Sequence, residues 1–155
     1  MKIAIGADHA GYRLKQAVAE HLRASGHEVA DFGTNSEESV DYPEYAEATA
    51  RAVANGEADR GVLVCGSGAG VCIAANKVDG IRGVNAHDVE EAVLTRQHNN
   101  ANVLCLSGRR LSEDQAFEIV DAWLAAEFEG GRHERRVDKI HDVEVHNRSH
   151  AGQTV

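Results

Sequence analysis

The chain has 155 residues, enough for one domain with a sizeable core. Its 43% hydrophobic residues and single proline are typical of a compact globular protein and exclude a disordered chain. The formal net charge of −9 repels phosphate backbones, so we expect no nucleic acid partner, whereas a small anion is compatible with a local basic pocket.

Short apolar runs alternate with amphipathic stretches along the chain. The strand-like runs are KIAIG, EVAD, GVLVC, RGVNA and NVLCL, at residues 2–6, 28–31, 61–65, 82–86 and 102–106. Apolar residues at helical spacing follow these runs, and SEDQ at 112–115 is a capping-box pattern that opens the fifth such stretch. The alternation predicts a single-domain α/β fold, a Rossmann-like three-layer sandwich with a five-stranded parallel sheet covered by helices on both faces.

The C-terminal segment differs in character from the rest of the chain. After two glycines it carries closely spaced basic residues with a narrow apolar edge: Arg132, Arg135, Arg136 and Lys139, with Val137 and Ile140. Such an edge is thin for packing on the chain's own sheet, so we predict a helix that docks on a partner subunit. We place the domain at residues 1–141 and expect residues 142–155, which have little to bury, to form a mobile tail.

The cysteine pattern and the start of the chain indicate a cellular compartment. Cys65, Cys72 and Cys105 are odd in number and form no C-x-x-C pair, which argues against a disulfide framework or a zinc ribbon and fits a reducing cytoplasm. The apolar stretch before Asp8 is too short for a signal peptide, and no segment has the ~20 apolar residues of a membrane span. We therefore expect a cytoplasmic protein with no membrane partner.

Parallel α/β sheets bind ligands at the carboxyl ends of their strands. This rule selects Asp8 and His9 after the first strand, residues 65–70 after the third, and residues 107–109 after the fifth. The glycine-rich turn at 66–70 opens a helix, whose free N–H groups and dipole suit a phosphate or an oxyanion. A tight turn that needs glycine only for its backbone is the other interpretation. A dinucleotide fingerprint is incomplete, because Val71 occupies its sixth place.

Two side chains are candidates for proton transfer. Cys65 lies between a strand and the glycine turn, where a helix N-terminus favours a thiolate that would act as a base, although a strand cysteine also serves packing. His98 would act as a general acid or base near neutral pH, or would simply cap a helix end. The spacing of His141, His146 and His150 is too loose for a metal site, so we expect these side chains to be solvent-exposed.

Six segments taken together resemble the type B ribose-5-phosphate isomerases, which are related to the galactose-6-phosphate isomerase subunits. They are GADHAG, VDYPEYA, CGSGAGVCIAANK, GIRGVNAHD, RQHNNANVL and GGRHERRV, in matching order and spacing from residue 6 to 137. The resemblance implies interconversion of ribose 5-phosphate and ribulose 5-phosphate through an enediolate, in the pentose phosphate pathway. It further implies a homodimer or homotetramer with sites completed across the subunit boundary, and neither a metal nor another cofactor.

The resemblance also implies roles for individual residues. Cys65 would be the base that moves a proton between C1 and C2, His98 would open the furanose ring, and Ser67 would help to shift protons between O1 and O2. Backbone amides of the turn would stabilise the enediolate, namely those of Gly66, Gly68, Ala69 and Gly70. The sugar hydroxyls would be held by Asp8, Tyr42 and Asn99, and the phosphate by His9, Arg109, Arg132 and Arg136.

The residues agree with these implied roles. Arg132 and Arg136 are four apart, so both guanidinium groups share one helix face, as a phosphate clamp requires. Relatives that lack the cysteine place a glutamate at the position of Val71, so Cys65 and Val71 assign this chain to the thiol-base group. The alternatives are an isomerase of a hexose or tetrose phosphate, and a non-catalytic sugar-phosphate-binding subunit. Retention of all three implied catalytic side chains disfavours the latter.

Overall fold

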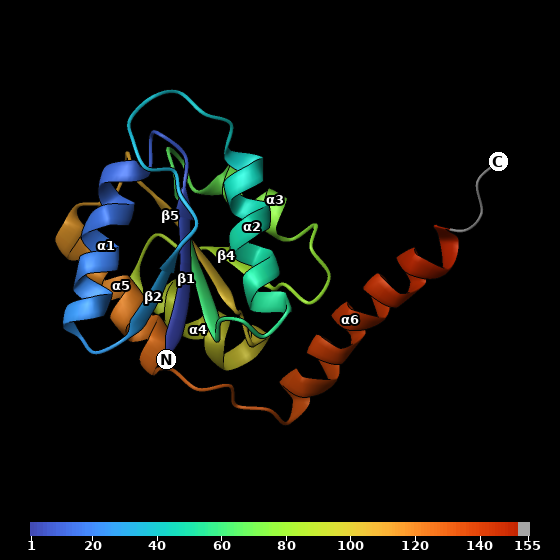
Figure 1. Ribbon diagram of the computed structural model, residues 1–155. Helices are drawn as coiled ribbons and strands as arrows, with labels where there is room; N and C mark the ends of the chain where they lie inside the picture. Colours follow the sequence, from blue (N-terminus) through green and yellow to red (C-terminus); the bar gives the residue numbers. More distant parts are fainter. Residues whose placement is uncertain (152–155) are drawn as a thin grey trace.

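Five parallel strands form the centre of the structure, in the order β2-β1-β3-β5-β4 (Figure 1). The computed structural model describes residues 1–151. The strands are β1 Lys2–Ala7, β2 Glu28–Asp31, β3 Arg60–Cys65, β4 Gly83–Asn85 and β5 Val103–Ser107. All four strand pairings are parallel, which confirms the predicted five-stranded parallel sheet.

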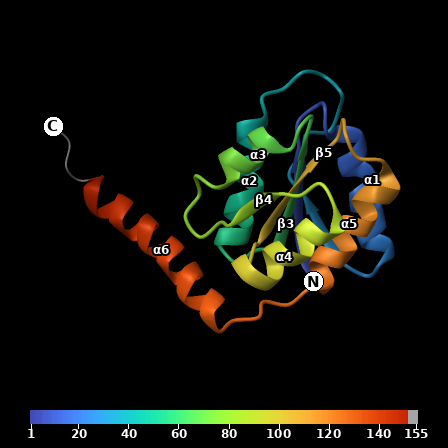
Figure 2. The ribbon, with the colours of Figure 1, turned by 180° about the vertical axis from the view of Figure 1, so that it is seen from behind.

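Helices cover both faces of this sheet. They are α1 Tyr12–Ala24, α2 Tyr42–Ala54, α3 Ala69–Ala75, α4 Val89–Asn99, α5 Glu113–Ala125 and α6 Arg132–His150. Helices α1, α4 and α5 pack on one face, and α2 and α3 pack on the other, so the three-layer prediction is confirmed (Figures 1 and 2). Ser112 and Gln115 form the predicted capping box at the start of α5. Among residues 1–151, no helix combines the length and apolar character needed to cross a membrane.

The alternation of side chains along β3 divides the core between the two faces. Val62 and Val64 pack in the layer of α1 and α5, whereas Leu63 and Cys65 pack in the layer of α2 and α3. Cys65 is therefore set by strand register on the α2–α3 side, at the last position of β3. Only 4% of the surface of Cys65 is exposed to solvent.

An ion pair between a buried lysine and a partly exposed aspartate connects α1 to the end of β2. Lys15 is inaccessible to solvent, and its Nζ lies 2.8 and 2.7 Å from the two carboxylate oxygens of Asp31. The same carboxylate accepts a hydrogen bond from the Gly33 N–H at 2.9 Å. The Gly33 carbonyl in turn accepts a hydrogen bond from the Ala7 N–H at 2.7 Å. The pair therefore holds the loop after β2 against the carboxyl end of β1.

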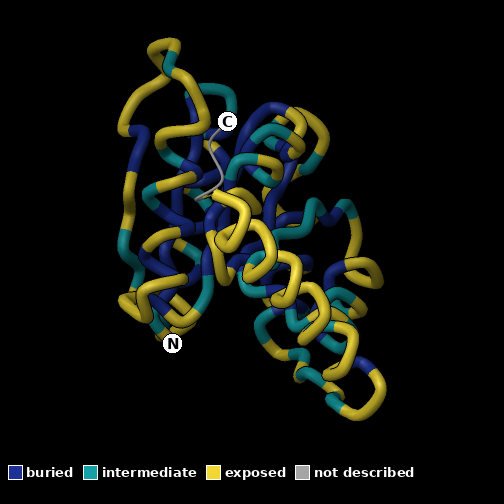
Figure 3. The backbone as a smooth tube through the Cα atoms, turned by 90° about the vertical axis from the view of Figure 1, so that its right-hand side faces the viewer, coloured by how far each residue is buried: buried dark blue, intermediate teal, exposed yellow. Residues whose placement is uncertain are grey.

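Helix α6 leaves the domain as an arm (Figure 1). It follows the linker at 126–131, and His133 is its only buried residue within this chain, as the mostly exposed tube in Figure 3 shows. The apolar side chains of Ile140, Val143 and Val145 are 45%, 57% and 44% exposed. Docking of this helix on a partner subunit stays a prediction, and these exposed apolar residues support it.

The helix is longer than the sequence indicates. A tail is expected from residue 142, but α6 continues to His150. Contacts with the loop after α3 account for the extra turns: Glu144 accepts a hydrogen bond from the Gly80 N–H at 2.9 Å, and Arg148 lies 3.4 Å from Asp79. Mobility of this end stays a prediction, and residues 152–155 of the expected tail lie outside the described residues.

The Lys15–Asp31 pair generates a prediction about stability. Asp31→Asn should lower the free energy of unfolding by about 3 kcal/mol, because it leaves the buried Lys15 ammonium without its counter-charge. Urea unfolding measures this loss. The exposed pair of Lys2 and Glu28, 4.0 Å apart, provides the control, and Lys2→Met should change stability by less than about 1 kcal/mol. The double variant Lys15→Met/Asp31→Asn should recover most of the loss, since no buried charge remains, and failure to recover would contradict this account.

Candidate active site

A cavity of about 320 Å³ opens at the carboxyl ends of β1, β3 and β5. The helices that follow β1 and β3, two neighbouring strands, pack on opposite faces of the sheet. Ligands bind to α/β sheets at such a topological switch point. The structure therefore brings together predicted residues from four separate segments of the chain: Asp8, His9, Tyr42, Cys65, Gly66, Ser67, Gly70 and Arg109, with Ala10 as a further lining residue.

The Cys65 thiol lies beneath the glycine turn. Its sulfur accepts a hydrogen bond from the Gly68 N–H, with 3.1 Å between nitrogen and sulfur. The sulfur is thus held as a hydrogen-bond acceptor beside the start of α3. Ser67 presents an exposed hydroxyl next to it, and that oxygen accepts a hydrogen bond from the Ala69 N–H at 3.1 Å.

Hydrogen bonds from β4 and β5 fix the backbone of the turn. The Ser107 hydroxyl donates to the Gly66 carbonyl at 2.7 Å, and the Gly108 N–H donates to the Cys65 carbonyl at 2.8 Å. The Asn85 side-chain amide donates to the Ser67 carbonyl at 3.3 Å. Sequence reasoning missed Asn85, because a lone asparagine at a strand end carries no distinctive pattern. Its position at the carboxyl end of β4 is the only signal that could have selected it.

Two glycines of the turn allow close approach of other side chains. A Cβ atom at Gly68, whose φ is +82°, would lie 2.5 Å from the Asn85 side-chain oxygen. At Gly70 a Cβ atom would lie 2.7 Å from Cζ of the Tyr42 ring. Glycine at position 70 therefore lets Tyr42, the first residue of α2, lie directly against the turn and line the cavity.

Donors suited to an anion lie on the β1 and β5 sides of the cavity. Nδ1 of His9 lies 3.1 Å from the Val40 nitrogen and 3.2 Å from the Val40 carbonyl oxygen, so the Val40 backbone holds the imidazole through Nδ1 in either tautomer. The Arg109 guanidinium lies over the turn, since a Cβ atom at Gly66 would be 3.1 Å from its Cζ. An imidazole and a guanidinium on these two sides of the cavity can together bind a phosphate.

Asp8 supplies the acidic group of the cavity. It is 7% exposed, and its Oδ1 accepts a hydrogen bond from the Gly11 N–H at 3.0 Å. A carboxylate oriented in this way can accept hydrogen bonds from sugar hydroxyls through its other oxygen.

The other two cysteines have different surroundings. Cys105 is fully buried in the α2–α3 layer, and burial raises the pKa of its thiol well above the ordinary value. A hydrogen bond with Cys105 lowers the pKa of Cys72, which is only half-buried. Neither residue lines the cavity.

Of the predicted site residues, Gly68 and Ala69 belong to the glycine turn but do not line this cavity. Four others lie on separate elements outside it: His98, Asn99, Arg132 and Arg136. Helix α4 follows the carboxyl end of β4 and returns the chain to the start of β5, so His98 and Asn99 lie at the amino edge of the sheet. The two edges are separated by the length of β5, roughly 13 Å at about 3.3 Å per residue. Within one chain, the structure does not bring these four residues to Cys65.

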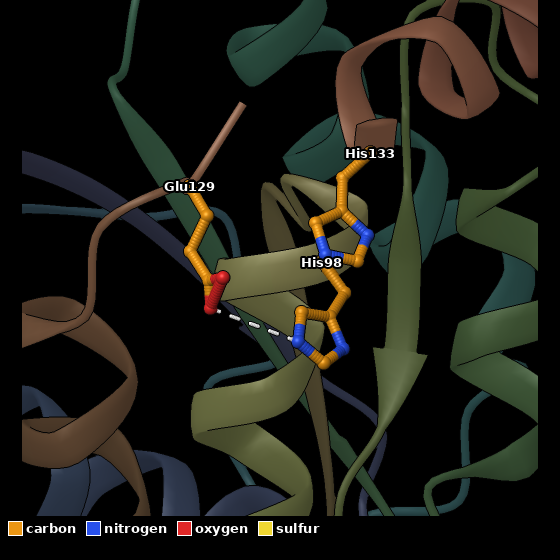
Figure 4. Close-up of side chains that lie close together, drawn as sticks. All are labelled: His98, Glu129 and His133. Carbon is orange, nitrogen blue, oxygen red and sulfur yellow. Dashed lines mark ion pairs between the residues drawn. The ribbon is translucent and has the colours of Figure 1, made fainter. Parts of the chain in front are cut away.

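His98 instead belongs to a second polar cluster (Figure 4). Its ring stacks on that of His133, with centroids 4.3 Å apart and 12° between the planes, and its Nε2 lies 3.7 Å from Oε1 of Glu129. Ligand atoms of these three residues lie within 4.8 Å of one another. However, a metal ion bonds an imidazole nitrogen in the plane of the ring, and two stacked rings share no such point. A metal would therefore require one ring to turn.

The charges around His133 determine its protonation. Burial, with 8% of the residue exposed, lowers the pKa of His133. A proton on the neighbouring His98 and the charges of Arg132 and Arg136 lower this pKa further, whereas the Glu129 carboxylate raises it. His133 is therefore neutral at pH 7. Sequence reasoning missed Glu129 and His133 as site residues, although both lie within or beside the segment GGRHERRV.

Comparisons with known proteins identify the family of the chain. Residues 3–140 match a family described as Ribose/Galactose Isomerase. The chain is 51% identical over 143 residues to ribose-5-phosphate isomerase B of Escherichia coli (strain K12), covering 92% of this chain and 96% of that protein.

Solved structures of similar proteins have the same fold. Ribose-5-phosphate isomerase B of Clostridium thermocellum matches with a TM-score of 0.94 and 51% identity, covering 95% of this chain and 99% of that one. The enzyme from Mycoplasma genitalium with bound ribulose-5-phosphate matches with a TM-score of 0.88 and 46% identity, covering 92% and 95%.

The lowered pKa of His133 predicts a pH-dependent stability. The unfolded chain binds more protons at this residue than the folded chain as the pH falls below the ordinary value of 6.5, so the free energy of unfolding should decrease in that direction. His133→Phe keeps an aromatic ring but cannot be protonated, and should therefore lose less stability between pH 7.5 and 5.5. Urea unfolding at the two pH values measures the difference.

Exposed His146 on the same helix is the control, and His146→Asn should behave as the unaltered chain. Equal pH sensitivity in His133→Phe would contradict the assignment.

Proposed function

The chain belongs to the ribose/galactose isomerase family, and from this premise we propose that it interconverts ribose 5-phosphate and ribulose 5-phosphate through an enediolate. The observation that carries the proposal is the Cys65 thiol, hydrogen-bonded under a glycine turn in a cavity that also holds His9 and Arg109 as anion donors. Aldose–ketose isomerisation requires a base, a stabilised oxyanion and a phosphate anchor, and this cavity offers a candidate for each.

The proton transfer can be written with named atoms. The Cys65 thiolate removes the proton from C2 of the open-chain aldose, and the electron pair moves to oxygen to form the enediolate. The Ser67 hydroxyl shifts a proton between O2 and O1, and the Cys65 thiol returns its proton to C1 to give the ketose. The thiolate is regenerated and the net electron count of the sugar is unchanged, so the reaction needs no electron carrier.

The glycine turn would stabilise the charge that develops during this step. Amide N–H groups of Gly66, Gly68, Ala69 and Gly70 would face the enediolate oxygens at the start of α3. Two of them, Gly68 and Ala69, donate to the Cys65 sulfur and the Ser67 hydroxyl in this structure, and would exchange these partners for the enediolate. The hydrogen bonds from Ser107 and Asn85 to carbonyls of the turn favour this role, because they fix the donors before the charge appears. Asp8 and Tyr42 would hold sugar hydroxyls, and His9 and Arg109 would bind the phosphate.

The site would be completed by a second copy of the chain. His98, Asn99, Arg132 and Arg136 lie outside the cavity of their own chain and close to the start of the exposed arm α6. In a homodimer or homotetramer these residues would enter a neighbour's cavity, with Asn99 on the sugar hydroxyls and the arginines on the phosphate. The exposed apolar side chains of α6 support such a contact.

We further assign the activity to the pentose phosphate pathway in the cytoplasm. The three cysteines are free, which suits a reducing compartment. A phosphorylated pentose is too polar to cross membranes unaided, so an enzyme for it is expected where the sugar phosphates are made.

Replacement of the base is the direct test. Cys65→Ala should lower kcat in both directions by 10²–10⁴ or more, roughly the factor that a positioned base contributes. Cys72→Ala is the matched control, because Cys72 lies outside the cavity and should leave the rate nearly unchanged. Activity that a chelator removes and a divalent ion restores would count against the proposed chemistry.

The same assay identifies the sugar. Aldose phosphates of four, five and six carbons are compared by kcat/KM, and ribose 5-phosphate should be the best substrate. A margin of about tenfold corresponds to ~1.4 kcal/mol in transition-state binding. A tetrose or hexose phosphate that wins by that margin would leave the mechanism intact but change the substrate.

Mixed dimers test the shared site. Arg136→Ala and Cys65→Ala chains, each inactive alone, should regain activity when they exchange subunits. In a mixed dimer one of the two sites carries both intact residues, so it should have about half of the normal activity. Tagged chains separated by affinity verify the composition. Inactive mixed dimers of verified composition would show that each site is built from a single chain.

A further inference from the structure

The backbone that carries His98 is held firmly at the end of α4. Arg96, which is 5% exposed, donates from Nη1 to the Ala101 carbonyl at 2.7 Å and to the Asn100 side-chain oxygen at 2.8 Å. Asn100 ends the helix in the left-handed conformation, with φ of 50°. These contacts fix the backbone but do not touch the imidazole ring, and 38% of the His98 side chain is exposed. The orientation of the ring must come from other neighbours.

Glu129 faces one ring nitrogen of His98. The Glu129 N–H donates to the Gln97 carbonyl at 3.0 Å, which fixes the linker to the residue before His98. From there the carboxylate reaches to 3.7 Å from Nε2 of His98 (Figure 4). A carboxylate beside Nε2 favours the tautomer that carries its proton on that atom. Nδ1 is then left as the proton acceptor of the neutral ring.

His133 covers the face of the same ring. The two imidazoles stack at 4.3 Å, and His133 is kept neutral by burial and by the positive charges around it, so it does not repel a proton that His98 takes up. Between Glu129 and His133 the chain turns at Gly130 and Gly131, with φ of +67° and +56°. A Cβ atom at either glycine would meet nothing within 4 Å, so glycine is needed there for the backbone turn alone. This turn brings both residues back onto His98.

We propose that Glu129 and His133 are positioning residues for His98, which fix the orientation and the tautomer of its ring for opening the cyclic sugar phosphate. The inference rests on the proposed function, in which His98 opens the furanose ring. The bond between C1 and the ring oxygen breaks, Nδ1 takes the proton from O1, and His98 then delivers it to the former ring oxygen. His98 ends the step unchanged, and the sugar becomes the open aldose.

The test compares two reactions of one variant. Ribulose 5-phosphate cannot close a five-membered ring through its phosphorylated oxygen, so exchange of its carbon-bound proton with solvent needs Cys65 but no ring opening. Conversion of ribose 5-phosphate needs both steps. Glu129→Gln should lower kcat for ribose 5-phosphate by about tenfold to a hundredfold, a part of the 10²–10⁴ that a positioned acid/base contributes. Proton exchange should change by less than about threefold.

Matched variants separate positioning from a structural effect. Glu127→Gln, an exposed residue of the same linker, should retain the normal rates of both reactions. Glu129→Asp, which keeps the charge, should recover part of the loss. His133→Ala should show the same split between the two reactions as Glu129→Gln, and His133→Phe, which keeps a stacking ring, should restore most of the rate. Equal losses of conversion and exchange in Glu129→Gln would overturn the proposal.

A spectroscopic measurement keeps this inference separate from the proposed function. Imidazole ¹⁵N chemical shifts of the full chain report the His98 tautomer, assigned by the signals that disappear in His98→Asn. The neutral ring should carry its proton on Nε2 and should become a mixture of tautomers in Glu129→Leu. An unchanged tautomer in Glu129→Leu would overturn the inference even in an active enzyme. Absence of Cys65-dependent proton exchange in the unaltered chain would instead refute the proposed function.

Discussion

Between β1 and β3 the chain changes from one face of the sheet to the other, and most features of the candidate site depend on this change. The strands are hydrogen-bonded neighbours, yet α1 packs on the side of α5 and α3 packs on the side of α2. Their diverging loops leave room for a ligand above the strand ends. The register of β3 then directs its last side chain, Cys65, toward the α2–α3 layer and beneath the turn that opens α3.

The candidate catalytic groups are held in two different ways. Around Cys65 the geometry comes from the sheet, since bonds from Ser107 and Gly108 fasten the turn to β5, a central strand. Around His98 it comes from side chains on a helix end, a linker and the first turn of α6. These two arrangements suit the tasks proposed for the two residues: Cys65, held by the sheet, as the base, and His98, held by side chains, as the group that opens the sugar ring. Proton transfer at carbon tolerates little displacement, whereas ring opening involves a cyclic substrate that must still change shape.

The sequence was sufficient for the fold and for the cavity of one chain, because both depend on local patterns. Apolar runs that alternate with stretches of helical periodicity identified the five strands, and the carboxyl-edge rule then grouped His9, Cys65 and Arg109 without any knowledge of distance. The sequence did not predict the features that depend on contacts between segments far apart in the chain. Asn85 and Glu129 contact segments that are remote in the chain, through a hydrogen bond and an ion pair respectively, and the extension of α6 is accompanied by contacts with the loop after α3. Apolar periodicity contains none of this information.

The burial of Cys65 also affects the chemical durability of the protein. Thiolates are the form of cysteine that peroxides oxidise and electrophiles alkylate, so a reactive sulfur on the surface would be lost quickly. Here only 4% of the residue is accessible, and the open route to it passes through the cavity lined by His9, Ser67 and Arg109. A sugar phosphate in that cavity would occupy the route. The ligand would then protect the sulfur against oxidative damage, and the vulnerability of the protein would be greatest when its substrate is scarce.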